Sequence, residues 1–337
     1  MAQKQFVIDM HAHFFPIFSQ KEAAEYDIES APWLHIYEDG KKGMILTGGK
    51  EYRPVYNALW DPAARIEEMD ALGVDMQVVS ATPIMLGYRC LSDKALRWCR
   101  FMNDYLIEKC CSYNNQRLKA LCQVPLQDVD AACREVSRAK SIGHIGVQIG
   151  NHVGDKDLDA PELLTFLTHC ANEGIPLLVH PYDLMKQGDR MKKWQLPGLV
   201  GMAAETHLSI LTLIFSGAFD RLPRSLKICF SHGGGSFPYL LGRADNIWHK
   251  RADVRKDCPS PPSYYCKHFF VDSVVFDPRV LRFLGGVVGV EHIMLGSDYP
   301  FLMGEKQVGS LVKGSDFSNE EKAAMLAGNA KYFFTLQ

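Results

Sequence analysis

The sequence predicts an α/β protein, a (β/α)8 TIM barrel with a small insertion after its first strand. Eight short apolar runs, rich in β-branched residues, alternate along the chain with stretches of helical periodicity. The runs are apolar on both faces, as in a parallel sheet that helices cover on the outside. The chain has 337 residues, whereas such a barrel needs about 250. We expect the surplus in two long segments between strands.

The predicted strands lie at 6–10, 74–80, 118–124, 144–149, 175–179, 226–231, 269–272 and 292–295. The helices expected between and after them lie at 61–72, 93–111, 128–141, 161–172, 203–219, 237–255, 278–288 and 320–333. Asp61 and Asp128 are suitable N-caps, and Gly73 and Gly174 are suitable residues to end a helix. A doubly wound open sheet is the alternative. It would usually have a glycine-rich turn after its first strand, where this chain has His-Ala-His.

The predicted organisation is a single barrel domain over residues 1–337. The first long segment, 14–60, follows strand one and is rich in glycine, proline and aromatic residues. We expect it to form a small insertion, such as a short hairpin. The second, 181–202, is a long loop after strand five. Both would lie at the end of the barrel where enzymes of this fold keep the active site.

Composition restricts the partners and the location. The formal net charge is -2, and no basic cluster is present, which argues against nucleic acid as the main partner. No window approaches the roughly 20 apolar residues of a membrane helix, and no signal peptide precedes the first strand. The ten cysteines contain no Cys-x-x-Cys pair. We therefore expect reduced core thiols in a cytoplasmic protein.

Two histidines at the end of the first predicted strand indicate a metal site. Side chains two residues apart lie on the same face of a strand, so His11 and His13 should project together, with Asp9 one step deeper. Two imidazoles on one rigid element form half of a zinc site. The alternative is a hydrogen-bonded pair of histidines without a metal.

Further polar residues end other predicted strands. His180 ends strand five, His232 ends strand six, and Asp298 follows strand eight. The carboxyl ends of all barrel strands meet at one mouth. His11, His13, His180 and Asp298 would together supply three imidazoles and a carboxylate to one Zn²⁺. His232 would be the base that takes a proton from water at the metal.

Further residues near this mouth are candidates for supporting roles. The glycines 233–235 should allow a close approach and offer backbone amides to an anionic group. Strand four ends before Asn151-His152 without a lysine whose carbamate could bridge two metals, so one metal is preferred. His152 remains an open candidate for a further ligand. Asp272, at the end of strand seven, could orient either a helix cap or a catalytic group.

Three arginines and a tryptophan are candidates for substrate binding. Arg53 lies among aromatic residues in the insertion, and Arg243 and Arg251 are eight residues apart on the predicted helix 237–255, roughly on one face. Arginine near an active mouth suits bidentate recognition of a carboxylate. A surface salt bridge is the alternative for each. Trp194 could cover the site or pack within its loop.

In combination, these motifs resemble the amidohydrolase superfamily, and more narrowly its metal-dependent, oxygen-independent decarboxylase branch. The resemblance runs essentially end to end and is carried by residues 9–16, 179–181, 231–235 and 295–300. These motifs occur across the superfamily, whereas their combination with Arg53 and Trp194 is much narrower.

The resemblance implies one Zn²⁺ per subunit, held by the four residues named above, with no organic cofactor and with His232 as acid and base. It implies non-oxidative decarboxylation of a small polycarboxylate, a carboxymuconate semialdehyde of tryptophan or related aromatic catabolism. Arg53 and an arginine from the neighbouring subunit of a homodimer would bind the carboxylates, and Arg243 and Arg251 match the positions of the crossing pair. Two chemical routes remain open, addition of hydroxide to the substrate and direct coordination of the substrate by the metal.

Two other classes of function remain as alternatives. A hydrolase of the same superfamily would cleave a lactone or an amide with the same metal site. A non-catalytic metal-binding protein should lack either an open coordination position or His232.

Overall fold

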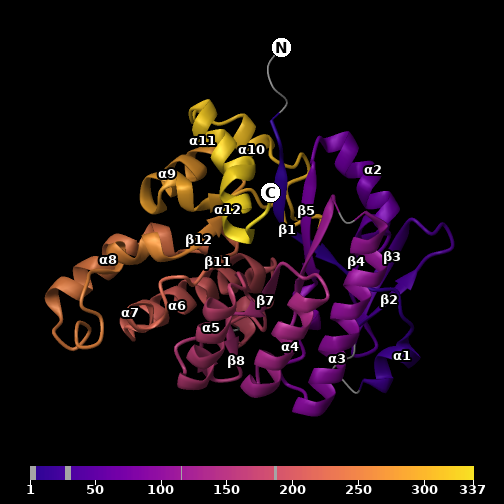
Figure 1. Ribbon diagram of the computed structural model, residues 1–337, viewed down its shortest axis with the longest axis horizontal. Coiled ribbons are helices and arrows are strands. Elements are labelled where there is room, and N and C mark those ends of the chain that lie inside the picture. Colours follow the sequence, from indigo (N-terminus) through magenta and orange to yellow (C-terminus); the bar gives the residue numbers. More distant parts are fainter. Residues whose placement is uncertain (1–4, 27–31, 115, 186–187) are drawn as a thin grey trace. The chain divides into compact units, whose positions relative to one another are not determined.

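The computed structural model describes residues 5–26, 32–114, 116–185 and 188–337, and its main feature is one eight-stranded parallel sheet (Figure 1). The strands follow one another in sequence order: β1 (Ile8–Phe14), β5 (Met76–Ala81), β6 (Leu118–Cys122), β7 (Gly146–Gly150), β10 (Leu177–His180), β11 (Ile228–Phe230), β12 (Phe270–Asp272) and β13 (Ile293–Met294). The N–H of Met10 in β1 donates to the carbonyl of Leu295, directly after β13, at 2.9 Å. Eight parallel strands in sequence order, with helices in the connections between them, confirm the predicted (β/α)8 barrel.

Helices follow the strands as the periodicity predicts. The principal ones are α2 (Pro62–Leu72), α3 (Ser92–Tyr105), α4 (Val129–Ser141), α5 (Pro161–Glu173), α6 (Met202–Phe215), α8 (Phe237–Lys250) and α9 (Pro278–Val288). The last predicted helix is divided into α11 (Asn319–Ala323), a π-helical turn and α12 (Asn329–Phe334), and short helices α7 (Ala218–Arg221) and α10 (Ser310–Lys313) occur between others. The Asp61 and Asp128 side chains accept from the N–H groups of Ala63 and Ala131, so both act as the expected N-caps.

The chain forms two compact units. The first comprises Met1–Gln148 and Leu295–Ser310, and the second Ile149–Met294 and Leu311–Gln337. Strands β1, β5 and β6 belong to the first unit, together with helices α2 to α4. Strands β10 to β13 belong to the second, together with α5 to α9. The predicted single domain over the whole chain remains a proposal.

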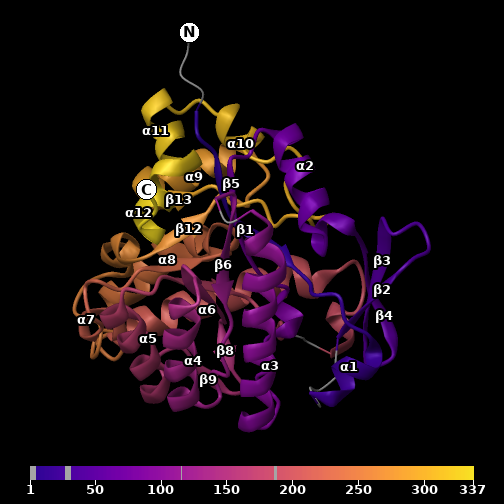
Figure 2. The same ribbon diagram turned by 45° about the vertical axis from the view of Figure 1, so that its right-hand side comes forward.

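The insertion after β1 is larger than the short hairpin that the sequence suggested. It contains helix α1 (Gln20–Glu25) and an antiparallel sheet of β2 (Trp33–Ile36), β3 (Lys42–Thr47) and β4 (Lys50–Tyr56) (Figure 2). The β3–β4 hairpin turns at Gly48 and Gly49, which both have positive φ, as a tight two-residue turn requires. Strand β2 is the third strand of this sheet. Its Leu34 side chain is buried in the same apolar cluster as Trp60 and Trp98.

The long segment after β10 leads through a 3₁₀ turn (Gly188–Met191) and a π-helical turn (Pro197–Gly201) into α6. The helical run Pro197–Phe215 has 19 residues and a window of mean hydropathy 1.5, which by length and composition alone could cross a membrane. The prediction that no window approaches the composition of a membrane helix is therefore wrong for this segment. One such helix is weak support for a membrane protein, because core helices of soluble proteins pass the same test. Glu205 lies within it and accepts a hydrogen bond from Asn151 Nδ2 at 3.0 Å.

Cysteines occupy interior positions, as the sequence predicts. Eight of the ten are buried, and they lie mainly on strands and helices that face the core. Burial raises the pKa of the Cys122 and Cys229 thiols, which keeps them protonated. These side chains therefore serve as small apolar packing groups.

Candidate metal centre and active site

Strand β1 carries both histidines within the strand rather than beyond its end. Its register against β5 pairs Asp9 with Gln77 and Ala12 with Val79, so β1 contains one extra residue at this point. Such a β-bulge re-aims side chains and is frequent beside active sites. The His11 and His13 side chains are fully buried, and their Nε2 atoms lie 3.1 Å apart. The two imidazoles therefore face a common point, as the spacing predicts.

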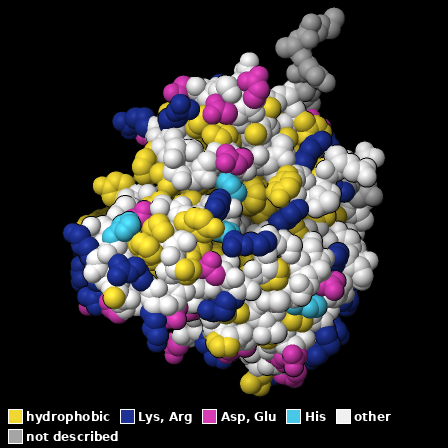
Figure 3. All heavy atoms as spheres, turned by 60° about the vertical axis from the view of Figure 1, so that its left-hand side comes forward, with side chains coloured by type: hydrophobic (Ala, Val, Ile, Leu, Met, Phe, Trp, Pro, Cys, Tyr) yellow, Lys and Arg dark blue, Asp and Glu magenta, His cyan; other side chains and the backbone are white. Residues whose placement is uncertain are grey.

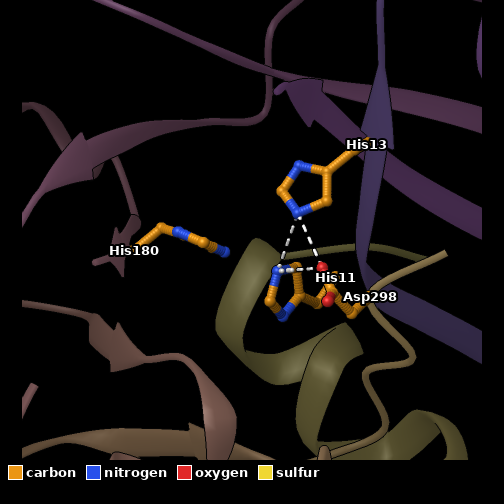
Figure 4. A group of neighbouring side chains, drawn as sticks. All are labelled: His11, His13, His180 and Asp298. Carbon is orange, nitrogen blue, oxygen red and sulfur yellow. Dashed lines mark hydrogen bonds and ion pairs between the residues drawn. The ribbon is translucent and has the colours of Figure 1, made fainter. Parts of the chain in front are cut away.

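The loop after β13 brings a carboxylate to the same point. Asp298 Oδ1 lies 3.0 Å from His13 Nε2 and 3.7 Å from His11 Nε2 (Figure 4). Asp298 has a φ of 59°, a left-handed conformation that a non-glycine residue adopts only when its surroundings enforce it. Two backbone bonds to β1 do so: Asp298 N–H donates to the His11 carbonyl at 2.9 Å, and the Tyr299 carbonyl accepts from His13 N–H at 2.7 Å.

His180, the last residue of β10, completes a group of four. One potential ligand atom from each of His11, His13, His180 and Asp298 lies within 4.8 Å of the others (Figure 4). His180 Nδ1 lies 2.9 Å from the Pro181 carbonyl. A carbonyl only accepts, so Nδ1 carries the proton and the lone pair is on Nε2. This is the tautomer that a metal ligand needs.

The donor set fits a divalent metal ion. Ligand atoms bound at about 2.1 Å with angles of 90° to 109° lie about 3.0 to 3.4 Å apart. The observed separations of 3.0, 3.1 and 3.7 Å are close to this range. Without a cation, lone pairs of buried acceptor atoms would face one another at an electrostatic cost. Three imidazole nitrogens and one carboxylate suit zinc, and manganese also binds such sets.

Asp9 connects two of the elements that carry these ligands, strand β1 and the loop after β13. Its carboxylate is fully buried and accepts from Ser297 Oγ at 2.6 Å, Gln77 Nε2 at 2.9 Å and the His11 N–H at 3.3 Å. Burial raises the pKa of Asp9 to about 6, and these hydrogen bonds act in the opposite direction. Asp9 thus ties β1 to the residue that precedes Asp298.

A buried arginine that no sequence motif indicates supports the same strand. Arg65 on α2 donates to Gln77 Oε1 at 2.8 Å and to the carbonyl of His13 at 2.5 Å. Its guanidinium also lies over the ring of Tyr299, 5.0 Å from the centroid. An arginine within an amphipathic helix gives no sign in the sequence that it will be buried.

His232 follows β11 and stands beside His180. The two rings meet edge to face with centroids 4.9 Å apart. His232 has a φ of 55°, and the next residue, Gly233, donates its N–H to Asp272 Oδ1 at 2.9 Å. Asp272 also accepts from the Val274 N–H at 3.1 Å. The ambiguous Asp272 therefore holds the loop that presents His232.

The three glycines after His232 are required for packing, and the expected anion-binding role is wrong. All three have positive φ. A Cβ on Gly233 would lie 2.5 Å from Val275 Cγ1, so a larger residue would displace the loop. The N–H groups of residues 233, 234 and 235 donate to Asp272 Oδ1 and to the carbonyls of Ser231 and His232, respectively. These amides are therefore occupied by the protein itself.

The insertion places Arg53 close to the histidine pair. Arg53 lies on β4, and its guanidinium is 4.5 Å from the ring centroid of Phe301. The Phe301 ring in turn lies 5.1 Å from the ring of His13. A positive charge thus stands one aromatic ring away from a candidate metal ligand, where it can meet a substrate carboxylate.

The structure places the remaining candidates outside this group. Helix α8 ends at Lys250, and Arg251 is its C-cap with φ -119° and ψ 113°, so the expected shared helix face with Arg243 is wrong. Arg251 Nη2 instead pairs with Asp253 Oδ2 at 2.7 Å, and Arg243 is exposed on α8. Trp194 has 79% of its surface exposed. His152 Nδ1 lies 2.8 Å from the Gly154 carbonyl, and the residue is not part of the group of four.

Comparison with known proteins places this site in a family. The profile of the amidohydrolase family matches residues 8–336, nearly the whole chain. The chain belongs to the amidohydrolase family. The resemblance stated from the sequence motifs is thereby confirmed.

Relatives and solved structures agree on the type of reaction. The chain is 37% identical to 2-amino-3-carboxymuconate-6-semialdehyde decarboxylase of Dictyostelium discoideum, over 98% of this chain and 91% of the relative. It is 30% identical to the decarboxylase of the same name from Caenorhabditis elegans, over 96% and 92%. The crystal structure of 5-carboxyvanillate decarboxylase from Sphingomonas paucimobilis matches with a TM-score of 0.81 and 25% identity, over 99% of this chain and 100% of the other.

Another crystal structure, of 5-carboxyvanillate decarboxylase from Novosphingobium aromaticivorans complexed with manganese, has a TM-score of 0.80 and 23% identity, over 99% and 97%. At this identity the likeness supports the fold alone. The more similar decarboxylases support a carboxy-lyase reaction for this amidohydrolase.

The packing around Gly233 yields a first prediction. Gly233→Ala should lower the catalytic rate strongly while metal is retained, because the added Cβ displaces the loop that carries His232. Gly242→Ala on α8 is the control, since nothing lies within 4 Å of its Cβ position. Steady-state rates and metal content of both variants provide the test. A Gly233→Ala enzyme with the wild-type rate would contradict the role assigned to this loop.

Proposed function

We propose that this amidohydrolase is a zinc-dependent decarboxylase of 2-amino-3-carboxymuconate-6-semialdehyde, which releases CO2 without oxidation and gives 2-aminomuconate semialdehyde. The observation that carries the proposal is the 37% identity to the Dictyostelium enzyme of that specificity over 98% of the chain. The convergence of His11, His13, His180 and Asp298 supports the metal dependence. Arg53 beside this group supports an anionic substrate.

The side chains have separate tasks in this reaction. Loss of CO2 leaves an electron pair on carbon, so the substrate needs an electron sink or a prior change at that carbon. A bound divalent metal would supply a Lewis acid that polarises a ligand or lowers the pKa of water. His232 would hold and return the proton, since its ring lies against that of His180. Arg53 would bind a carboxylate of the substrate and fix its orientation.

Zinc is the proposed metal because neutral imidazole nitrogens dominate the donor set. The manganese complex of the Novosphingobium enzyme makes manganese the alternative to be tested. Both ions can occupy a set of three imidazoles and a carboxylate, so the identity of the ion requires elemental analysis of the purified protein.

Metal content and turnover together test the proposed function. The wild-type enzyme should bind about one zinc per chain and release CO2 from 2-amino-3-carboxymuconate-6-semialdehyde as the absorbance of that substrate is lost. His180→Ala should lose metal and activity together, whereas the control His152→Ala should keep both, because His152 is outside the group of four. Elemental analysis and a CO2 assay provide the measurements.

Three outcomes would contradict parts of this proposal. Turnover of aromatic acids such as 5-carboxyvanillate, with none of the semialdehyde, would reject the substrate. Hydrolysis of lactones or amides without CO2 would favour the hydrolase alternative. Loss of metal from His152→Ala would add a ligand to the proposed set.

Arg53 provides a second test within the same proposal. Arg53→Gln should raise KM by about 10- to 100-fold, since a charge-assisted hydrogen bond contributes about 1.5 to 3 kcal/mol. Metal content should not change, because Arg53 contacts Phe301 rather than a ligand atom. The control is Arg97→Gln, whose guanidinium lies 5.9 Å from the centroid of Tyr26. An unchanged KM for Arg53→Gln would remove this residue from substrate binding.

We also propose a homodimer in which an arginine of one subunit completes the site of the other. Exposed apolar side chains lie on and near α6 in the second unit, among them Leu199, Val200 and Leu208, and Tyr239 on α8 is 82% exposed. Hydrophobic and basic side chains lie side by side on the surface in Figure 3. Exposed apolar patches rimmed by polar residues mark protein–protein interfaces, in which tyrosine and arginine are enriched. Exposed Arg243 and Arg251 lie on and directly after α8.

Mixing two inactive variants tests the shared arginine. His232→Asn chains combined with Arg243→Ala or with Arg251→Ala chains should regain about one quarter of the wild-type rate, because half of the dimers are mixed and each has one complete site. The unmixed variants are the controls. If neither mixture gains activity while mixed dimers are shown to form, no arginine crosses the interface.

The buried thiols support a reducing compartment such as the cytoplasm, which we propose as the location. Fractionation of cells that express the protein would test this proposal directly.

A further inference from the structure

A series of hydrogen bonds between buried polar side chains leads from a backbone carbonyl to His13. Gln148 Nε2 donates to the carbonyl of Ala81 at 2.8 Å, and Gln148 Oε1 lies 2.6 Å from Ser80 Oγ. Ser80 Oγ lies 3.4 Å from His13 Nδ1. Ser80 and Gln148 are each 1% exposed, and His13 is fully buried. All four residues belong to the first compact unit.

The donor and the acceptor of each hydrogen bond in this series follow from the backbone carbonyl at its end. The Ala81 carbonyl can only accept, so the atom of Gln148 that faces it is the amide nitrogen, and the amide oxygen faces Ser80. That oxygen must accept the one hydroxyl proton of Ser80, and the short distance of 2.6 Å agrees with this. The Ser80 oxygen then presents a lone pair to His13 Nδ1. Therefore Nδ1 carries the imidazole proton.

We propose that Ser80 and Gln148 are positioning residues that set the tautomer of His13 and thereby make its Nε2 a metal ligand. A proton on Nδ1 leaves the lone pair on Nε2, the atom that lies 3.0 Å from Asp298 Oδ1 and 3.1 Å from His11 Nε2. The inference rests on the proposed metal site and goes beyond it, because it assigns a function to two residues that touch neither the metal nor the substrate. Outer partners of this kind typically change metal affinity by about 10- to 100-fold.

The two residues should act in different ways when they are replaced. Ser80→Ala removes the acceptor for Nδ1–H, so the tautomer is no longer fixed. Gln148→Met removes the closer acceptor of the Ser80 hydroxyl, which is then able to donate to His13 Nδ1 as well as to the Ala12 carbonyl at 3.3 Å. Donation to Nδ1 stabilises the wrong tautomer, with the proton on Nε2. Because Gln148 acts through Ser80, Gln148→Met should have little effect once Ser80 is alanine. The pair should therefore be strongly non-additive.

The experiment measures metal affinity rather than turnover. Zn²⁺ dissociation constants are measured for the wild type, both single variants and the double variant by competition with a chelator, and Co²⁺ spectra report the geometry of the bound ion. Each single variant should bind Zn²⁺ about 10- to 100-fold more weakly, and the double variant should resemble Ser80→Ala. The control is Thr82→Val, which removes a buried hydroxyl whose acceptor is the backbone carbonyl of Phe14 at 3.4 Å rather than an imidazole nitrogen. Thr82→Val should keep the wild-type affinity.

A structural role alone would give a different pattern. Urea unfolding of the metal-free variants measures the loss of folding stability separately, and ¹⁵N NMR of histidine-labelled metal-free protein reports which nitrogen of His13 is protonated. Wild-type affinity in Ser80→Ala, or additive losses in the double variant, would overturn the inference. If the wild-type protein itself failed to bind a divalent metal, the proposed metal site would fail instead.

Discussion

Two imidazole nitrogens and a carboxylate oxygen that converge within 3.0 to 3.7 Å are the arrangement on which the rest of this site depends. The two histidine side chains are fully buried, so solvent does not separate these acceptors. Such a convergence is unfavourable unless a cation fills it and the surrounding protein holds the ligands in place. The bulge in β1 and the backbone bonds between β1 and residues 297–299 provide this constraint. Asp9 adds a buried carboxylate that joins the same two elements through Ser297.

The candidate metal ligand Asp298 and the candidate substrate-binding residue Arg53 are connected through one short loop. Asp298 supplies a candidate ligand, and three residues later Phe301 supports the guanidinium of Arg53. The ring of Phe301 also lies 5.1 Å from that of His13. A displacement of this loop would therefore alter the candidate metal site and the position of the positive charge together. The insertion matters for the same reason, because its strand β4 carries Arg53 against the loop.

The parts of the fold that follow from local pattern could be predicted from the sequence. All eight barrel strands occur near their expected positions, because β-branched apolar runs between capped helices have few other solutions. The spacing of His11 and His13 was sufficient to place their imidazoles side by side. Strand order and the C-terminal positions of His180 and Asp298 were sufficient to bring them to the same group. In each of these cases, the periodicity of the sequence and the order of the strands are enough to predict the position of the residue.

The sequence predictions failed where contacts between distant parts of the chain determine the local structure. Helix α8 stops before Arg251, where the backbone turns and the arginine pairs with Asp253, and no breaker residue in the sequence marks that point. The amides of the glycines 233–235 are occupied because Asp272, some 40 residues away in the chain, accepts one of them. Buried Arg65 and the pair of Ser80 and Gln148 were missed for the same reason. Their partners lie on other elements, so their roles become visible only when side chains are placed.

Arg53 and the glycine loop bear differently on the choice between decarboxylase and hydrolase. Cleavage of a lactone or an amide develops an oxyanion, and a bound divalent metal ion stabilises it as readily as backbone amides do. The amides of residues 233–235 instead stabilise the loop that presents His232. Arg53 places a positive charge near the candidate metal site. Its planar guanidinium suits a substrate carboxylate that is not lost in the reaction. A decarboxylase acting on a substrate with more than one carboxylate needs such a group to hold one carboxylate while it loses another. The position of Arg53 thus agrees with the carboxylated substrates for which the relatives are named, whereas the occupied amides do not separate the two reactions, because a bound metal ion would serve either.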